Sequence, residues 1–177
     1  MKRAPLFLLG LALLLAAACG DDDAADPTAG DRASDLDAAS FVGVARPANV
    51  AMPNADLTPG AVFPASAAEI CVKGYSSKVR NVSTKTKNQA YASYGIASHS
   101  TGAYEVDHLI SLELGGSNDI ANLWPEPGEP RPGFHEKDQL ENKLHDLVCR
   151  GEVDLATAQQ EIATDWFAAW VKYLGAK

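Results

Sequence analysis

The sequence lacks the long hydrophobic runs of membrane-spanning proteins. Its longest apolar stretch covers residues 4–18, which is too short and too close to the N-terminus for a committed transmembrane helix. Cysteine is scarce as well, with three in 177 residues, and no Cys-x-x-Cys pair or Cys/His cluster in the sequence indicates a zinc site. No internal repeat is present, so the length predicts one domain with extensions.

The apolar stretch has the form of an export signal. Lys2 and Arg3 supply a positive start, residues 4–18 supply the apolar region, and small residues directly precede Cys19. This arrangement resembles a bacterial lipoprotein signal peptide over residues 1–18, which implies a lipid anchor on Cys19. An ordinary secretory signal that leaves Cys19 unmodified is the alternative. Both predict export, and the first predicts a protein anchored in the bacterial envelope, in the periplasm or at the cell surface.

Export bears on the two remaining cysteines. In an oxidising compartment Cys71 and Cys149 are expected to form one disulfide, and two free buried thiols are the alternative. Because such a bond closes a long loop, the chain-entropy model gives it about 3–5 kcal/mol of stabilisation.

Negative charge is missing from one part of the chain. The formal net charge of −8 argues, as an average, against a nucleic-acid partner. From Ile70 to Tyr104, however, there is no Asp or Glu. The same stretch carries five cations: Lys73, Lys78, Arg80, Lys85 and Lys87. These residues predict a basic face that binds the phosphates of a nucleic acid, and a solvated face without a partner is the alternative.

Composition divides the exported chain into a linker and a domain. Residues 19–56 are rich in Asp and Ala and are interrupted by prolines, so they are expected to form a flexible linker. Residues 57–177 are expected to form one folded domain of ordinary size, and the protein is expected to be a monomer.

The pattern of the domain predicts an α+β fold. Helices are expected over residues 84–94, 134–151 and 154–175, the last with three aromatic anchors. A strand is expected over residues 103–114, a glycine turn over 115–119, a second strand over 120–124, and a proline-rich loop over 125–133. The order is therefore strand, turn, strand, helix.

Four polar side chains occupy positions of the strand, turn, strand, helix segment that differ from their surroundings. Asp107 and His108 interrupt an apolar run, Asn122 lies on the returning strand, and His135 opens the next helix. The phrases "DHLISLELGGSNDIANLW" and "HEKDQLENKLH" resemble the HNH endonuclease family, which has a ββα-metal core. The resemblance covers the chain from about Cys71 to the last helix.

The resemblance implies a role for each of these residues. His108 is the expected general base, because imidazole titrates near neutral pH and can deprotonate water. Asp107 and His135 are expected to bind a divalent metal, Mg²⁺ first, with Mn, Zn or Ni as alternatives. Asn122 is expected either to add a second oxygen ligand or to brace the hairpin. The basic residues between 73 and 87 would hold the flanking phosphates.

The match departs from the family between the second strand and the helix. The family often has a cysteine pair that binds structural zinc there, and this chain has "WPEPGEPRPGF". The gap before His135 is longer than in the family, so His135 is only a candidate ligand, and Asp138, one turn further on, could share the metal face. A Cys71–Cys149 disulfide would then replace the structural zinc as the cross-link of the fold.

Two functions from different classes fit this sequence. The first is an exported, metal-dependent HNH-type endonuclease that hydrolyses phosphodiester bonds of DNA, or also of RNA, with low sequence specificity. The second is a noncatalytic envelope lipoprotein that binds nucleic acid or another surface polymer. The enzyme requires the imidazole of His108 and a cation held by Asp107 to reach the same phosphorus atom, and the binding protein does not.

Overall fold

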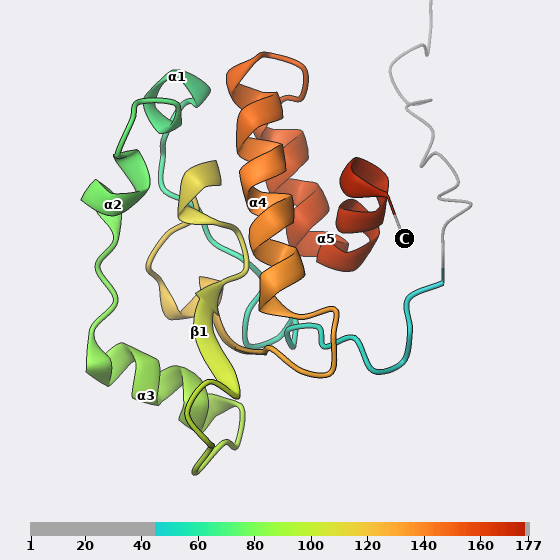
Figure 1. Ribbon diagram of the computed structural model, residues 1–177. Coiled ribbons are helices and arrows are strands. Elements are labelled where there is room, and N and C mark those ends of the chain that lie inside the picture. The colour runs from blue at the N-terminus through green and yellow to red at the C-terminus, as the bar shows by residue number, and fades with distance from the viewer. Residues whose placement is uncertain (1–44, 176–177) are drawn as a thin grey trace, which may run out of the picture. The chain divides into compact units, whose positions relative to one another are not determined.

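The computed structural model describes residues 45–175. The expected signal peptide, Cys19 and residues 19–44 of the expected linker lie outside the described residues. The described part contains five α-helices, two 3₁₀ turns and one two-stranded antiparallel sheet (Figure 1). This is the α+β class expected from the sequence. In residues 45–175, no helix has both the length and the apolar character needed to cross a membrane.

The elements follow one another in a simple order. Along the chain they are α1 (Ala67–Ile70), α2 (Tyr75–Val79), α3 (Thr84–Ser93), β1 (Tyr104–His108), the 3₁₀ turns η1 (Leu112–Leu114) and η2 (Ile120–Asn122), β2 (Leu123–Pro127), α4 (Phe134–Cys149) and α5 (Leu155–Leu174).

β1 is shorter than the hydrophobic pattern predicts, and β2 lies later in the chain than predicted. β1 ends at His108, which pairs with Leu123, and does not continue to residue 114. Ser111 and Asp119 explain the difference, because each side chain accepts a hydrogen bond from a backbone amide two residues further on and so begins a 3₁₀ turn. β2 consequently starts at Leu123 and extends into the expected loop as far as Pro127.

The helices agree more closely with the pattern. Ser83 caps α3 by accepting a hydrogen bond from the amide of Thr86 at 3.1 Å. α4 begins at Phe134 as expected and buries its apolar stripe. α5 is interrupted at Asp165, whose backbone is not helical and whose side chain accepts a hydrogen bond from the amide of Ala168. The apolar pattern does not predict this interruption, because it continues regularly on both sides of Asp165.

The core lies mainly between α4 and α5, which run side by side in Figure 1. Leu140, Leu144, Ile162 and Trp166 are fully buried there. A disulfide between Cys71 and Cys149 ties the end of α1 to the end of α4, with 5.6 Å between their Cα atoms. The hairpin of β1 and β2 lies at the other end of α4, where it is held by polar contacts.

Part of the expected linker packs on this core. Val50 is only 6% exposed, and the indole of Trp166 donates a hydrogen bond to the carbonyl of Ala51 at 3.1 Å. Arg46 forms an ion pair with Asp165 at 2.9 Å, at the interruption of α5. The folded part therefore begins before residue 57, because isolated apolar residues in a proline-broken segment can still find sites on a formed core.

Candidate functional site

The hairpin is braced from inside by Asn122. This side chain is fully buried, and its Oδ1 accepts a hydrogen bond from the amide of Ile110 at 2.9 Å. Its Nδ2 donates to the carbonyls of Ile110 and Ser117 at 3.0 and 2.9 Å. Gly116 allows this close approach, since a Cβ there would lie 1.7 Å from the Ile110 carbonyl oxygen. The bracing role expected for Asn122 thus occupies its amide and leaves no oxygen facing solvent.

His108 ends β1 and is nearly enclosed, with 2% of its surface exposed. Its Nε2 lies 3.2 Å from Oδ1 of Asn118. Asn118 also accepts from the amide of Asn81 and donates to the carbonyl of Val79, so it joins the hairpin to the segment after α2. Since Oδ1 can only accept, we assign the proton to Nε2. The neutral ring then carries its lone pair on Nδ1, which has no hydrogen-bond partner among residues 45–175.

Burial lowers the pKa of His108 below its usual value, because the charged imidazolium loses its water. The positive charges of Arg80 and Lys137 act in the same direction, whereas Asp107 and the bond to Asn118 act against it. His108 is therefore neutral at pH 7, which is the form that a general base needs.

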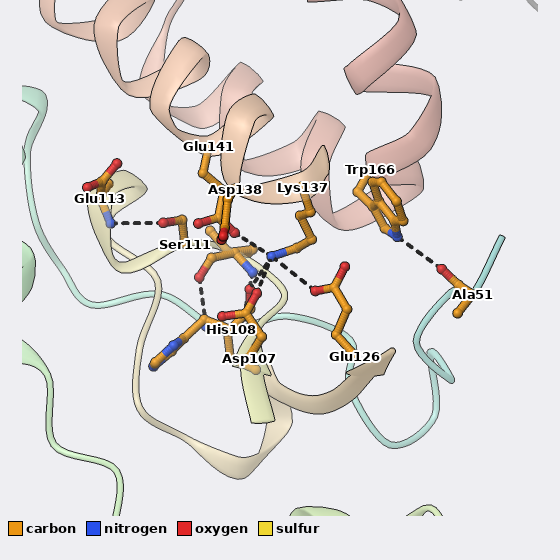
Figure 2. Close-up of polar contacts among 12 residues, drawn as sticks. Ala51, Asp107, His108, Ser111, Glu113, Glu126, Lys137, Asp138, Glu141 and Trp166 are labelled. Carbon is orange, nitrogen blue, oxygen red and sulfur yellow. Dashed lines mark hydrogen bonds and ion pairs between the residues drawn. The ribbon is translucent and has the colours of Figure 1, made fainter. Parts of the chain in front are cut away.

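Asp107 points to a different place from His108, as expected for neighbours on a strand. Its Oδ2 accepts a hydrogen bond from Nζ of Lys137 on α4 at 2.7 Å. The same ammonium donates to the carbonyl of His108 at 2.8 Å and to Glu141, and it lies 3.7 Å from Glu126. The Lys137 side chain is fully buried. Figure 2 shows this ammonium between the carboxyl groups and the ring of His108 directed away from it.

The charges of this cluster are strongly coupled. Burial alone would lower the pKa of Lys137, but its attraction to Asp107, Glu141 and Glu126 raises it well above the usual value. Burial would raise the pKa of Asp107, and its attraction to Lys137 lowers it instead. Burial raises the pKa of Glu126 well above normal and that of Glu141 to about 7. The charged Lys137–Asp107 pair thus lies beside a Glu126 carboxyl group that burial shifts toward its neutral form.

The expected metal ligands are not brought together. Asp107 bonds to Lys137, Asn122 is buried in the hairpin, and His135 is exposed on the first turn of α4 with its ring 4.3 Å from that of Phe134. Within residues 45–175, one group of three His, Cys, Asp or Glu residues has ligand atoms within 4.8 Å of one another, and it includes none of these. The arrangement around Asp107 therefore does not fit a divalent ion.

Asp138, the alternative ligand, is exposed on α4. Its pKa is raised, first by partial burial and then by the nearby charge of Asp107. The charge of Asp107 therefore reaches Asp138, but of these two carboxylates only Asp107 contacts the ammonium of Lys137.

The group that does converge is Cys71, His145 and Cys149. Its sulfurs are joined in the disulfide and are not thiolates, so they are not metal ligands in this state. Nε2 of His145 lies 3.4 Å from Sγ of Cys149 and 3.3 Å from the carbonyl oxygen of Ile70. The sequence hides this group, because Cys71 is 78 residues away from Cys149.

The expected basic residues lie at the surface of the protein. All five are exposed, and none forms an ion pair with a carboxylate in the described part of the chain: Lys73, Lys78, Arg80, Lys85 and Lys87. Arg80 is close enough to lower the pKa of both His108 and Asp138. Lys87, on α3, acts in the same way on Glu105 of β1. Two of the five cations, Arg80 and Lys87, therefore act on residues of β1.

No protein-family model matches this chain, and neither the curated proteins nor the solved structures contain a significant match.

Sequence reasoning missed the residues that hold the site together. Lys137 carries a usable signal, because it stands three and seven positions before Leu140 and Leu144, on the buried stripe of α4. A lysine at a core position of an amphipathic helix indicates buried carboxylate partners. Asn118 and Glu126 offer no such signal, since asparagine in a glycine turn and glutamate between prolines are ordinary surface residues.

Proposed function

We propose that this protein is an exported nuclease that hydrolyses phosphodiester bonds of nucleic acid with low sequence specificity, using His108 as the general base. One observation carries the proposal. Asn118 joins the neutral ring of His108 to the Val79–Asn81 segment, and this segment contains Arg80, an exposed cation that acts on His108.

Each group has a task in this reaction. The exposed cations attract the phosphate backbone, whose binding needs no base contacts. Arg80 stabilises the negative charge that grows on the phosphorus centre. Nδ1 of His108 takes a proton from a water molecule as the water oxygen bonds to phosphorus and the bond to the leaving oxygen breaks. Low specificity follows from contacts made mainly with phosphates.

Two observations favour a second function, because the enzyme expected from the sequence required His108 and a cation at Asp107 to reach the same phosphorus atom. His108 is enclosed, and the cation at Asp107 is a buried ammonium. With 2% of its surface exposed, His108 meets a phosphate only after neighbouring residues have moved. A protein that binds nucleic acid or another polyanion on the basic face without cleaving it needs no such movement. This second candidate is a noncatalytic envelope protein.

A cleavage assay separates the two candidates. The purified full chain is incubated with supercoiled plasmid, single-stranded DNA and RNA, and nicking or shortening is followed on gels. His108→Gln keeps a hydrogen-bonding group near Asn118 and is expected to lose about 10²–10⁴-fold in rate. His99→Gln, at an exposed position, is the matched control and should keep full activity. Cleavage that survives in His108→Gln would remove this residue as the base.

A binding assay tests the basic face. Affinity for DNA is measured against salt concentration for the wild type and for Arg80→Gln with Lys87→Gln. Loss of each phosphate contact is expected to lower the slope of log affinity against log salt by about 0.9. Lys143→Gln, on α4, is the control and should leave the slope unchanged. Binding without cleavage would establish the second candidate, and absence of both would refute both.

A further inference from the structure

The position beside Asp107 already contains a cation. The ammonium of Lys137 is fully buried, 2.7 Å from Oδ2 of Asp107, 2.8 Å from the carbonyl oxygen of His108 and in contact with Glu141. Oε2 of Glu126 lies 3.7 Å from the same nitrogen. These are oxygen donors of the kind that hard divalent ions prefer. Here they face an ammonium, a group that supplies one positive charge and three hydrogen bonds.

The carboxyl groups around Lys137 outnumber the single positive charge that they face. Glu126 has no exposed side-chain surface, and neither of its carboxyl oxygens has a hydrogen-bond partner among the described residues. A buried carboxyl group without a hydrogen bond is costly, so its presence here needs a cause. Asp107, Glu126 and Glu141 all face the one ammonium, and while it is present their oxygen atoms do not form a group that could hold a metal ion.

We propose that Lys137 is the resident cation of this site, that its ammonium fills the place expected for a divalent ion, and that cleavage needs no divalent ion at Asp107. Lys137 is a positioning residue. It holds the carboxylate of Asp107 and the carbonyl of His108 together, and so fixes the end of β1 from which the imidazole projects. It does not touch the substrate, because its side chain is fully buried.

The first test uses the wild type and rests on the proposed function. Cleavage by the full chain is measured with EDTA and with Mg²⁺ or Mn²⁺. Equal rates are expected. Cleavage that EDTA abolishes and Mg²⁺ restores would overturn the metal independence, whereas no cleavage in either condition would fail the proposed function and leave the second test to decide the role of Lys137.

The second test does not depend on nuclease activity. Lys137→Ala empties the centre of the carboxyl groups, which should then bind Mn²⁺ or Ca²⁺. The melting temperature of this variant is expected to rise by roughly 5 °C with a saturating divalent ion. The wild type and Lys143→Ala should not respond. Adding Glu126→Gln to Lys137→Ala should reduce the response, because one ligand is removed.

The outcomes are distinct. A metal response in Lys137→Ala alone supports the proposal, and an equal response in the wild type overturns it, since the ion would then bind beside the ammonium. If Lys137→Ala does not fold, Mn²⁺ titration of the wild type by calorimetry decides the question. If the wild type shows heat of Mn²⁺ binding that disappears in Asp107→Asn, the proposal is overturned. If the wild type shows no such heat, the proposal is supported. In a catalytically active protein, Lys137→Arg should lower kcat and leave KM unchanged, because the ammonium does not contact the substrate.

Discussion

Removal of the buried ammonium should make the stability of this protein depend steeply on pH. In Lys137→Met the aliphatic part of the side chain is kept, so packing on the stripe of α4 changes little. Asp107 loses its partner at 2.7 Å, and the carbonyl of His108 loses its donor at 2.8 Å. Removing one member of a buried pair typically costs about 3–5 kcal/mol.

Protonation sets an upper limit on this cost. Asp107 can escape its unpaired charge by binding a proton, which at pH 7 costs about 4 kcal/mol for a carboxyl group with an ordinary pKa near 4. At pH 4.5 the same step costs less than about 1 kcal/mol. We therefore expect the variant to be destabilised by about 3–4 kcal/mol at pH 7.5 and by about 1 kcal/mol at pH 4.5.

The pKa of Asp107 in the wild type and its expected pKa in the variant predict the same direction for the change of the stability difference with pH. In the wild type the pKa of Asp107 is lowered, so its stabilising contribution is present above the unfolded pKa and is lost as pH falls. In the variant the pKa of Asp107 should be raised by burial, so stability is full below the unfolded pKa and is lost as pH rises. Both trends make the difference between the two proteins smaller at acid pH.

Urea unfolding followed by tryptophan fluorescence at the two pH values measures this difference. Lys143→Met is the matched control, because Lys143 stands two residues after Glu141 and so points to the opposite side of α4. It should change stability by less than about 0.5 kcal/mol at either pH. An equal destabilisation of Lys137→Met at pH 4.5 and 7.5 would refute the electrostatic account and leave only lost packing.

Three further outcomes are expected. Glu141 has a pKa of about 7, raised by burial, so wild-type stability should fall as pH rises from about 5 to 8, by up to about 3 kcal/mol; Glu141→Gln should flatten this decline in urea titrations at several pH values. Reduction of the Cys71–Cys149 disulfide, which spans 78 residues, should cost about 4–5 kcal/mol and lower the melting temperature, and Cys149→Ser should reproduce the loss. Asn122→Ala should cost about 3–5 kcal/mol, because it leaves three buried backbone groups without partners; a loss below 1 kcal/mol in calorimetry would mean that water replaces the amide.

The local elements were largely predictable because neighbouring residues decide them. Ser83 marks the start of α3, and the apolar stripe with Leu140 and Leu144 marks α4. The same local logic gave the strands the wrong limits. The expected strand limits followed hydrophobicity alone. They did not take into account that Ser111 and Asp119 begin 3₁₀ turns by accepting hydrogen bonds from nearby amides.

The site was predictable only as a set of unusual residues. Asp107, His108 and Asn122 stand out in an apolar sequence, and all three have buried polar roles at the hairpin. Their partners were not predictable, because Lys137 lies 30 residues from Asp107, and Glu126 and Asn118 have no local peculiarity. The expected ligand set assumed a metal where the fold places an ammonium.

The sequence by itself determined the α+β class, the positions of the main helices and the segregation of positive charge between Ile70 and Tyr104. Those features follow from residue spacing and composition, which act over a few neighbours. Only the tertiary structure decided that Asp107 faces a buried lysine and that His108 is enclosed and bonded to Asn118. Such pairings depend on which side chains the packed chain brings within a few ångströms, and interactions between distant residues leave almost no trace in local sequence.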